Sequence, residues 1–349
     1  MQSNYGARIG RMWRRQPLLA RDEAWAQQQD LDALCRDRVL QTSELLSAND
    51  YYGNAEMVKR YVGLPALYPL KAVIPHGVAL SATWVWQAEV NSRLPVYFSY
   101  CRNRRRALSQ HGFAAIVDFV HPFLLALELL RHQAPKARRG TIVFRKHSTH
   151  MLDMVVDDEL LVGQLERIPS DRQPVTVCLY WKDVLRGVQR VYQRRGIPVV
   201  SAGHIFDSMF LPRLVHLLSS FAHAASAEVG THVFLAIAAG CHFHLLDPVP
   251  VAVRGAEPKE DTLPPAATLS PERKRLLRML TSSRADQRTV TGEHIGEVGP
   301  WGRYEVLAKL FLAESLFRPY RCVKRGERLL SRSGRIVRRV LDLATSKTG

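Results

Sequence analysis

The chain has 349 residues, a net charge of +17 and a pI of about 10.0. Its 46% hydrophobic and 23% charged residues are typical of a globular protein, and the length suggests two domains. No apolar run reaches the roughly 18 residues needed to span a bilayer. The N-terminus has basic residues but no apolar signal core or cleavage site, so a cytoplasmic protein starting near Met1 is expected.

The five cysteines are scattered, and none forms a CxxC pair (Cys35, Cys101, Cys178, Cys241, Cys322). Cys178 and Cys241 lie in apolar stretches, where a thiol behaves as a small hydrophobic group. A disulfide framework and a zinc ribbon are therefore not expected.

The first seventy residues mix good helix formers with spaced apolar residues and predict helices. Strands and helices then alternate, and glycine or proline marks several of the boundaries. The expected strands are 71–78, 94–100 and 113–119, and the expected helices are 102–112 and 122–133. Such alternation predicts βαβ units and a parallel sheet.

"HQAPKARRG" (His132–Gly140) interrupts this alternation and reads as a linker, after which the pattern starts again. The expected strands are 140–144, 174–181, 197–203, 223–226 and 241–247, and the expected helices are 157–168, 182–196, 209–218 and 230–240. The proline-rich residues 248–271 read as a surface excursion, and helices are expected around 272–281 and 303–317.

The fold class expected is therefore α/β, with two Rossmann-like domains, parallel sheets and a C-terminal helical tail. The expected division is an N-terminal domain over 1–135, a second domain over 136–249, the excursion and closing helices over 250–317, and a basic tail over 318–349. The tail holds ten Lys and Arg against Glu327 and Asp342, a net charge of +8.

Four polar loops follow strands of the second domain: "RKHSTH" (Arg145–His150), Tyr180 and Trp181, "GHIFD" (Gly203–Asp207) and "SAEVGTH" (Ser226–His232). Ligands of open parallel sheets bind beyond the carboxyl ends of the strands, and helix N-termini attract anions. The candidate nucleotide-binding residues are Lys146, His147, Ser148, Tyr180, Gly203, His204, Asp207, Ser226, Gly230 and Thr231. The alternatives are that Ser226 caps a helix, that His204 is a satisfied strand-end histidine, and that the first loop is a solvated turn.

No metal site is expected from the sequence. "HSTH" (His147, His150) lacks a nearby carboxylate or cysteine, and "HFH" (His242, His244) places two histidines on one strand face without a third ligand. "DLD" (Asp30–Asp32) has the form of a DxD metal-binding signature. It falls inside an expected helix, where residues two apart do not face the same way, so it is not taken as a metal site.

The segments "TIVFRKHSTH", "VTVCLYWKD", "VVSAGHIFDSMFLPRL" and "SAEVGTHVFLAIAAGC" resemble a GT-B family of bacterial glycosyltransferases that build capsule and O-antigen. The resemblance covers roughly residues 71–247 and implies transfer from a nucleotide sugar to a glycan or lipid-linked acceptor. His204 and Ser226 match the positions that hold the donor phosphate in GT-B sialyltransferases. The family histidine precedes proline, whereas His204 precedes Ile205, so CMP-, UDP- and GDP-linked donors all remain open.

"IPHGV" (Ile74–Val78) resembles the loop that faces the donor across the cleft, which makes His76 a candidate base. In "VDFVHPF", Asp118 or His121 is either the base on the acceptor side or a structural residue. No cofactor and no metal are implied, because the phosphate charge is met by His204, Lys146 and the helix at Gly230.

The basic tail indicates an anionic partner. Residues 321–344 place Ile336, Val337, Val340 and Leu341 on one side of a helix among arginines, which suits the anionic inner face of the cytoplasmic membrane. A helix packed on the N-terminal domain is the alternative. Nucleic acid is not expected, because the basic clusters lack interleaved aromatics and known motif spacings. A GT-B nucleotide-sugar epimerase and a non-catalytic binding protein remain alternative functions.

Overall fold

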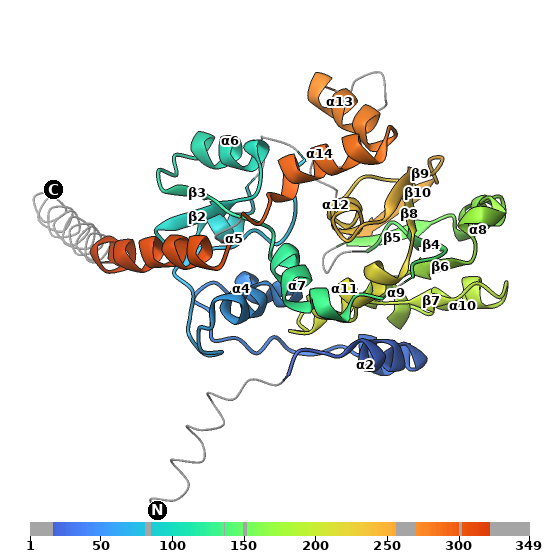
Figure 1. Cartoon of the computed structure of the whole chain (residues 1–349), viewed down its shortest axis with the longest axis horizontal. Helices are drawn as coiled ribbons and strands as arrows, with labels where there is room; N and C mark the ends of the chain where they lie inside the picture. The colour runs from blue at the N-terminus through green and yellow to red at the C-terminus, as the bar shows by residue number, and fades with distance from the viewer. Residues whose placement is uncertain are drawn as a thin grey trace, which may run out of the picture.

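The structure, a computed structural model, describes residues 17–80, 85–135, 137–148, 152–255, 270–299 and 302–321. In this part of the chain a three-stranded and a five-stranded parallel sheet lie at opposite ends of the molecule, with helices around each (Figure 1). The α/β class and the parallel sheets expected from the sequence are confirmed.

The first sheet has the strand order β1-β2-β3, with all strands parallel. Its strands are β1 (Ala72–Val73), β2 (Val96–Ser99) and β3 (Ile116–Asp118), and the nearby helices are α4 (Asn54–Val62), α5 (Gln87–Val90), α6 (Arg102–Gln110) and α7 (Pro122–Leu130). Because side chains alternate along a strand, Val96 and Phe98 pack against α4 and the helix over 302–321, whereas Tyr97 packs on the side of α6.

The second sheet has the order β7-β6-β4-β8-β9, again all parallel. Its strands are β4 (Thr141–Phe144), β6 (Val175–Cys178), β7 (Val199–Val200), β8 (His223–Ser226) and β9 (His242–Leu245). Its helices are α8 (Asp158–Glu166), α9 (Trp181–Leu185), α10 (Gln189–Gln193), α11 (Phe210–Ser220) and α12 (Thr231–Ala238). Ile142 and Phe144 pack with α11 and α12 on one face, and Val143 packs with α8 and α9 on the other.

The first described residues belong with the second sheet. α2 (Arg21–Ala26), η1 (Gln27–Gln29) and α3 (Leu31–Cys35) pack on its helices α11 and α9. The backbone N–H of Ser201 donates to Gln28 at 2.8 Å, and Leu31 and Leu34 enter the core on the α8 side. The expected N-terminal domain over 1–135 includes these residues, which here pack on the second sheet. Residues 36–46 then lead to η2 (Ser47–Gly53) and the first sheet.

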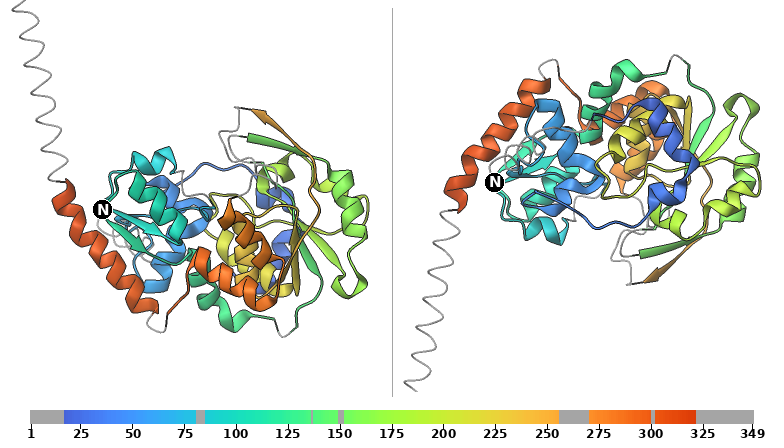
Figure 2. Two further views of the ribbon diagram at one scale, coloured as in Figure 1. Left: turned by 90° about the horizontal axis from the view of Figure 1, so that it is seen from above. Right: turned by 90° about the horizontal axis from the view of Figure 1, so that it is seen from below.

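The chain returns to the first sheet at its C-terminal end. α13 (Pro271–Leu280) and α14 (Arg284–Ile295) pack on the second sheet, and the helix over 302–321 then lies along the outside of the first (Figure 2). Val306, Leu310 and Ala313 of this helix are buried there. Residues 322–349, which hold most of the expected basic tail, lie outside the described residues.

Three elements differ from the sequence-based prediction. β5 (Leu152–Val156), for which no element was predicted, pairs antiparallel with β10 (Val251–Gly255), in the stretch expected to be irregular. α14 was not expected. The single helix predicted over 182–196 is divided into α9 and α10 at Gly187, whose φ of +78° is left-handed and ends a helix. The remaining short helices are η3 (Arg131–Gln133) and η4 (Ser170–Arg172). Among the described residues, no helix combines the length and the apolarity needed to cross a bilayer.

Candidate functional site

The candidate site lies at the edge of the second sheet where its parallel strands end. From β4 the chain adds β6 and β7 on one side and β8 and β9 on the other, so the strand order reverses between β4 and β8. Ligands of open parallel sheets bind beyond the carboxyl ends of the strands at such a reversal, because the loops there diverge to opposite faces.

A cavity of about 180 Å³ lies at this reversal, and its wall includes Arg145 and Lys146 after β4 and Ala227 and Glu228 after β8. Nζ of Lys146 lies 3.1 Å from Oε2 of Glu228, so an ion pair joins the two loops. Lys146 was expected here from the sequence. Arg145 and Glu228 were missed, because one charged residue in a loop forms no pattern.

A buried ion network supports the loop after β4. The Arg145 guanidinium binds both carboxylate oxygens of Asp158, at 2.6 and 3.1 Å, and lies 3.6 Å from Asp183. The hydroxyl of Ser148 donates to Asp183 at 2.8 Å and accepts from Arg186 at 3.1 Å. Ser148 is fully buried in this network, so its hydroxyl holds the loop and is not presented to a ligand.

Aromatic side chains connect the loops of the second sheet. The rings of His147 and Tyr180 lie 4.7 Å apart, Tyr180 and Trp181 lie 5.7 Å apart, and Trp181 and His204 lie 4.0 Å apart. The next ring is that of Phe206, 5.0 Å from His204. The structure therefore brings together His147, Tyr180 and His204, which the sequence placed on three separate loops.

The row of rings continues toward the segments that surround the first sheet. Phe206 lies 5.4 Å from Tyr51, Tyr51 lies 6.0 Å from Trp86, and Trp86 lies 5.2 Å from His76. We call the residues from His147 to His76 the aromatic row. Flat rings of this kind can stack on a base or on the apolar face of a sugar. Sequence analysis could not find Tyr51, Trp86 and Phe206, because their proximity depends on the packing of the two domains.

His204, a member of the aromatic row, is fully buried. Its Nδ1 accepts a hydrogen bond from the N–H of Phe206 at 3.1 Å, so the proton of the neutral ring is on Nε2, 3.2 Å from Asp37. Burial lowers the pKa of His204, and the hydrogen bond with Asp37 opposes this shift only in part. His204 is therefore a neutral N–H donor, and the exposed Asp37 carboxylate is its acceptor.

The turn after His204 is held by a buried arginine. Arg213 donates to the carbonyl of Ala202 at 2.6 Å and to Asp207 at 3.0 Å. Gly203 has φ +91°, and a Cβ there would lie 2.8 Å from the Arg213 guanidinium. Asp207 thus neutralises Arg213 and fixes the loop that carries His204.

The loop between β8 and α12 presents an uncapped helix. The hydroxyl of Ser226 accepts from the N–H of Glu228 at 3.3 Å and lies 3.2 Å from Nε2 of His232, so Ser226 does not cap α12. Gly230 is the N-cap residue and offers no side-chain acceptor. Oγ1 of Thr231 accepts from the N–H of Val78 in the first domain at 3.0 Å. Burial lowers the pKa of His232 to about 4, so this imidazole is neutral.

The three candidate bases have different surroundings. His76 is half-buried at the end of the aromatic row. Asp118 has a side chain 76% exposed and paired with Arg105 at 2.6 Å. His121 is buried and caps α7, because its Nδ1 accepts from the N–H of Phe123 at 3.1 Å. Burial, assisted by the nearby His76, lowers the pKa of His121 to about 3.

Asp30 lies at the start of a helix, not in the middle of one as expected from the sequence. Asp30 is the N-cap of α3, and its carboxylate accepts from the N–H of Ala33 at 2.9 Å. Its carboxylate is therefore engaged in helix capping.

No protein-family model matches the chain, and no match was found among curated proteins or solved structures.

Proposed function

We propose that the protein is a GT-B glycosyltransferase that moves a sugar from a nucleotide-sugar donor to a growing surface polysaccharide or a lipid-linked glycan. The observation that carries the proposal is the cavity at the β4–β8 reversal, which is lined by Arg145, Lys146 and Glu228. Strand order β7-β6-β4-β8-β9 is the 3-2-1-4-5 order of a Rossmann-like nucleotide-binding sheet, which supports a dinucleotide-like or nucleotide-sugar ligand.

The arrangement of the two sheets supports transfer between two ligands. Loops of the first domain approach the carboxyl edge of the second sheet: Val78 contacts Thr231, and Tyr51 contacts Phe206. We propose that the second domain holds the donor and that the first, a smaller Rossmann-like unit, receives the acceptor. The CMP-, UDP- and GDP-linked donors are equally compatible with this arrangement.

In this proposal, groups of the protein itself stabilise the negative charge that develops on the leaving phosphate. Lys146, the Nε2–H of His204 and the N-terminus of α12, which has no side-chain cap, each offer a donor. In the structure, Glu228 pairs with Lys146 and Asp37 pairs with His204. In this proposal, the donor phosphate displaces both carboxylates when it binds. Transfer then needs no metal, and EDTA leaves the turnover rate unchanged.

His76 is the base that this geometry favours. It stands at the first-domain end of the aromatic row, within two residues of Val78, which is bonded to the N-terminus of α12. Asp118 faces solvent beside Arg105, and His121 is buried with its Nδ1 engaged in capping. A base must reach the hydroxyl from which it takes a proton, which favours His76 over the other two.

The test is product analysis with a panel of nucleotide sugars and glycan acceptors, together with donor affinity by calorimetry. His204→Ala should lower turnover about 100-fold, the usual effect of removing one charge-stabilising donor. His76→Gln should abolish transfer while the donor still binds. The matched control is His111→Gln, at the exposed end of α6, which should keep wild-type rates.

Two outcomes contradict the proposal in different ways. Donor conversion in the absence of any acceptor identifies a nucleotide-sugar epimerase. Donor binding without turnover, or no binding of any nucleotide sugar, indicates that the protein is non-catalytic. Wild-type rates for His204→Ala and Ser226→Ala together remove these residues from the donor site.

A further inference from the structure

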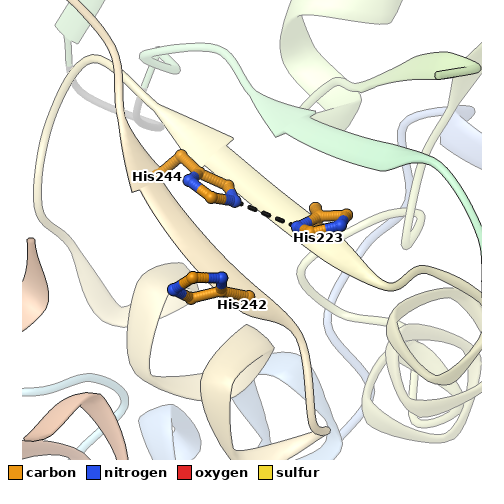
Figure 3. Close-up of side chains that lie close together, drawn as sticks. All are labelled: His223, His242 and His244. Carbon is orange, nitrogen blue, oxygen red and sulfur yellow. Dashed lines mark hydrogen bonds between the residues drawn. The ribbon is translucent and has the colours of Figure 1, made fainter. Parts of the chain in front are cut away.

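Three histidines of the second sheet converge on one face of two neighbouring strands (Figure 3). His242 and His244 are two apart on β9, so they share a face, and His223 of β8 is paired directly with His242. One ring nitrogen from each of the three lies within 4.8 Å of the others. Nδ1 of His223 and Nε2 of His244 are 3.0 Å apart. The third ligand that "HFH" lacks in the sequence is therefore supplied by the neighbouring strand.

We propose that His223, His242 and His244 bind one divalent transition-metal ion of the zinc class, which links the edge strand β9 to β8. Three imidazoles are a donor set that suits zinc, nickel or copper. Zinc–nitrogen bonds of about 2.0–2.1 Å place the nitrogens of a tetrahedral site about 3.4 Å apart. One pair of nitrogens is 3.0 Å apart and all three lie within 4.8 Å of one another, so a metal ion requires only small shifts of the side chains in this proposal.

The protonation state of the cluster suits metal binding. Burial and the guanidinium of Arg172 lower the pKa of His244 to about 4. Burial and Arg284 lower the pKa values of His223 and His242 as well. The backbone of Ser282 opposes the lowering of the His242 pKa only in part.

Arg172 competes with a metal at this site. A guanidinium can only donate, so Nδ1 of His244, 3.2 Å from Arg172, is an acceptor and Nε2 carries the proton shared with His223. A metal on Nε2 moves that proton to Nδ1, and the contact with Arg172 is then lost. Removing the Arg172 side chain should strengthen metal binding, since it removes both this contact and a nearby positive charge.

The cluster is separate from the proposed donor site. His223 and His242 begin their strands, whereas Ser226 and Glu228 lie at and beyond the end of β8. A cavity of about 240 Å³ adjoins His244 and Arg172 and leaves room for water as a fourth ligand. The ion therefore acts as a cross-link that stabilises the second domain and takes no part in sugar transfer.

The experiment uses the full chain, stripped of metal with EDTA and then titrated with Zn²⁺ and Co²⁺. Equilibrium dialysis with metal analysis measures stoichiometry, the visible spectrum of Co²⁺ reports its ligands, and thermal unfolding measures stabilisation by bound metal. Wild type should bind one ion per chain and unfold at a higher temperature with Zn²⁺. His223→Gln, His242→Gln and His244→Gln should each weaken binding at least tenfold, whereas His111→Gln should not.

The proposal is overturned if the wild type binds no stoichiometric ion, or if the three glutamine variants bind as tightly as the wild type. Circular dichroism identifies any glutamine variant that fails to fold. Arg172→Gln keeps all three ligands and provides a second measurement. Binding that is at least as tight as in the wild type supports the proposal, and weaker binding contradicts it.

Discussion

The backbone N–H of Val78 donates a hydrogen bond to Oγ1 of Thr231 at 3.0 Å, and this bond joins the loop after β1 to the first residue of α12. A Cβ on Gly77 would lie 3.0 Å from the same oxygen, so glycine leaves room for the approach. The contact holds His76, two residues before Val78, close to the helix end where we propose that the donor phosphate binds. This contact therefore links the segment after β1 of the first sheet to the second sheet at the candidate site.

Replacing Thr231 tests this contact. Thr231→Val keeps the shape of the side chain but removes the oxygen that accepts from Val78, so it should lower the free energy of unfolding by about 1 kcal/mol. Thr231→Ser keeps the acceptor and serves as the control. Denaturant unfolding measures both variants, and a valine variant as stable as the serine variant would show that the bond is not needed.

A second contact between the domains depends on a glycine. Gly53 has φ +75°, and a Cβ there would lie 2.4 Å from the backbone oxygen of Ser208. Gly112 has a similar φ of +80°, but a Cβ added to Gly112 would have no other atom within 4 Å. Alanine at Gly112 should cost about 1–2 kcal/mol of stability, the backbone penalty alone. Alanine at Gly53 should cost about 1–3 kcal/mol more, because it also pushes the domains apart.

The comparison of these two alanine variants by denaturant unfolding isolates the steric part of the cost. If Gly53→Ala and Gly112→Ala are equally destabilised, residues 51–53 can move away from Ser208 without loss, and the contact does not fix the two domains.

Local patterns predicted several strands and helices of both sheets. "HAAS" was expected as a strand over 223–226 and is β8, and the strand and helix periods also located α6, α7 and α12. These elements are visible in the sequence because their apolar residues recur with the period of the element and glycine or proline ends them. The parallel arrangement followed from their alternation.

Features that depend on distant residues could not be predicted in this way. β5 has its partner β10 almost a hundred residues later, so the pairing cannot be found from the local sequence. His223 joins His242 and His244 only through strand register, and the aromatic row assembles Tyr51, Trp86 and Phe206 from two domains. The sequence shows which residues carry charge or reactive groups, but it does not show which of these residues come together in the folded chain.

Acid should destabilise the protein through His121. The pKa of this imidazole is lowered from 6.5 to about 3 in the folded chain, mainly by burial. Between these values the unfolded chain takes up a proton that the folded chain does not. The contribution of the neutral His121 to the free energy of unfolding is therefore fully present above about pH 6.5. It is lost as the pH falls toward 3, by about 1.4 kcal/mol per pH unit.

His121→Gln removes this titration. The loss of stability between pH 7 and pH 5, measured by urea unfolding, should be about 2 kcal/mol smaller in the variant than in the wild type. His111→Gln is the control and should keep the wild-type loss. An unchanged loss in His121→Gln would mean that His121 reaches solvent and titrates in the folded protein.

The C-terminal end of the chain combines an exposed apolar surface with a concentration of positive charge. The helix over 302–321 buries Val306 and Leu310 on the first sheet, whereas Tyr304 and Phe311 are 69% and 74% exposed. Residues 318–349 carry a net charge of +8. An anionic leaflet attracts basic segments by about 1 kcal/mol per Lys or Arg near the surface, and salt weakens this attraction.

We therefore expect the full chain to sediment with anionic liposomes and not with neutral ones, and to be released as the salt concentration rises. A chain that ends at Arg321 keeps the helix with Tyr304 and Phe311 but loses eight of the ten basic residues, so it should bind much more weakly. Phe311→Ser in the full chain measures the contribution of the exposed apolar surface, which should be smaller because one ring supplies less than the charges do. Equal binding by the full and shortened chains, or no binding of the full chain at physiological salt, would exclude the tail as a membrane anchor.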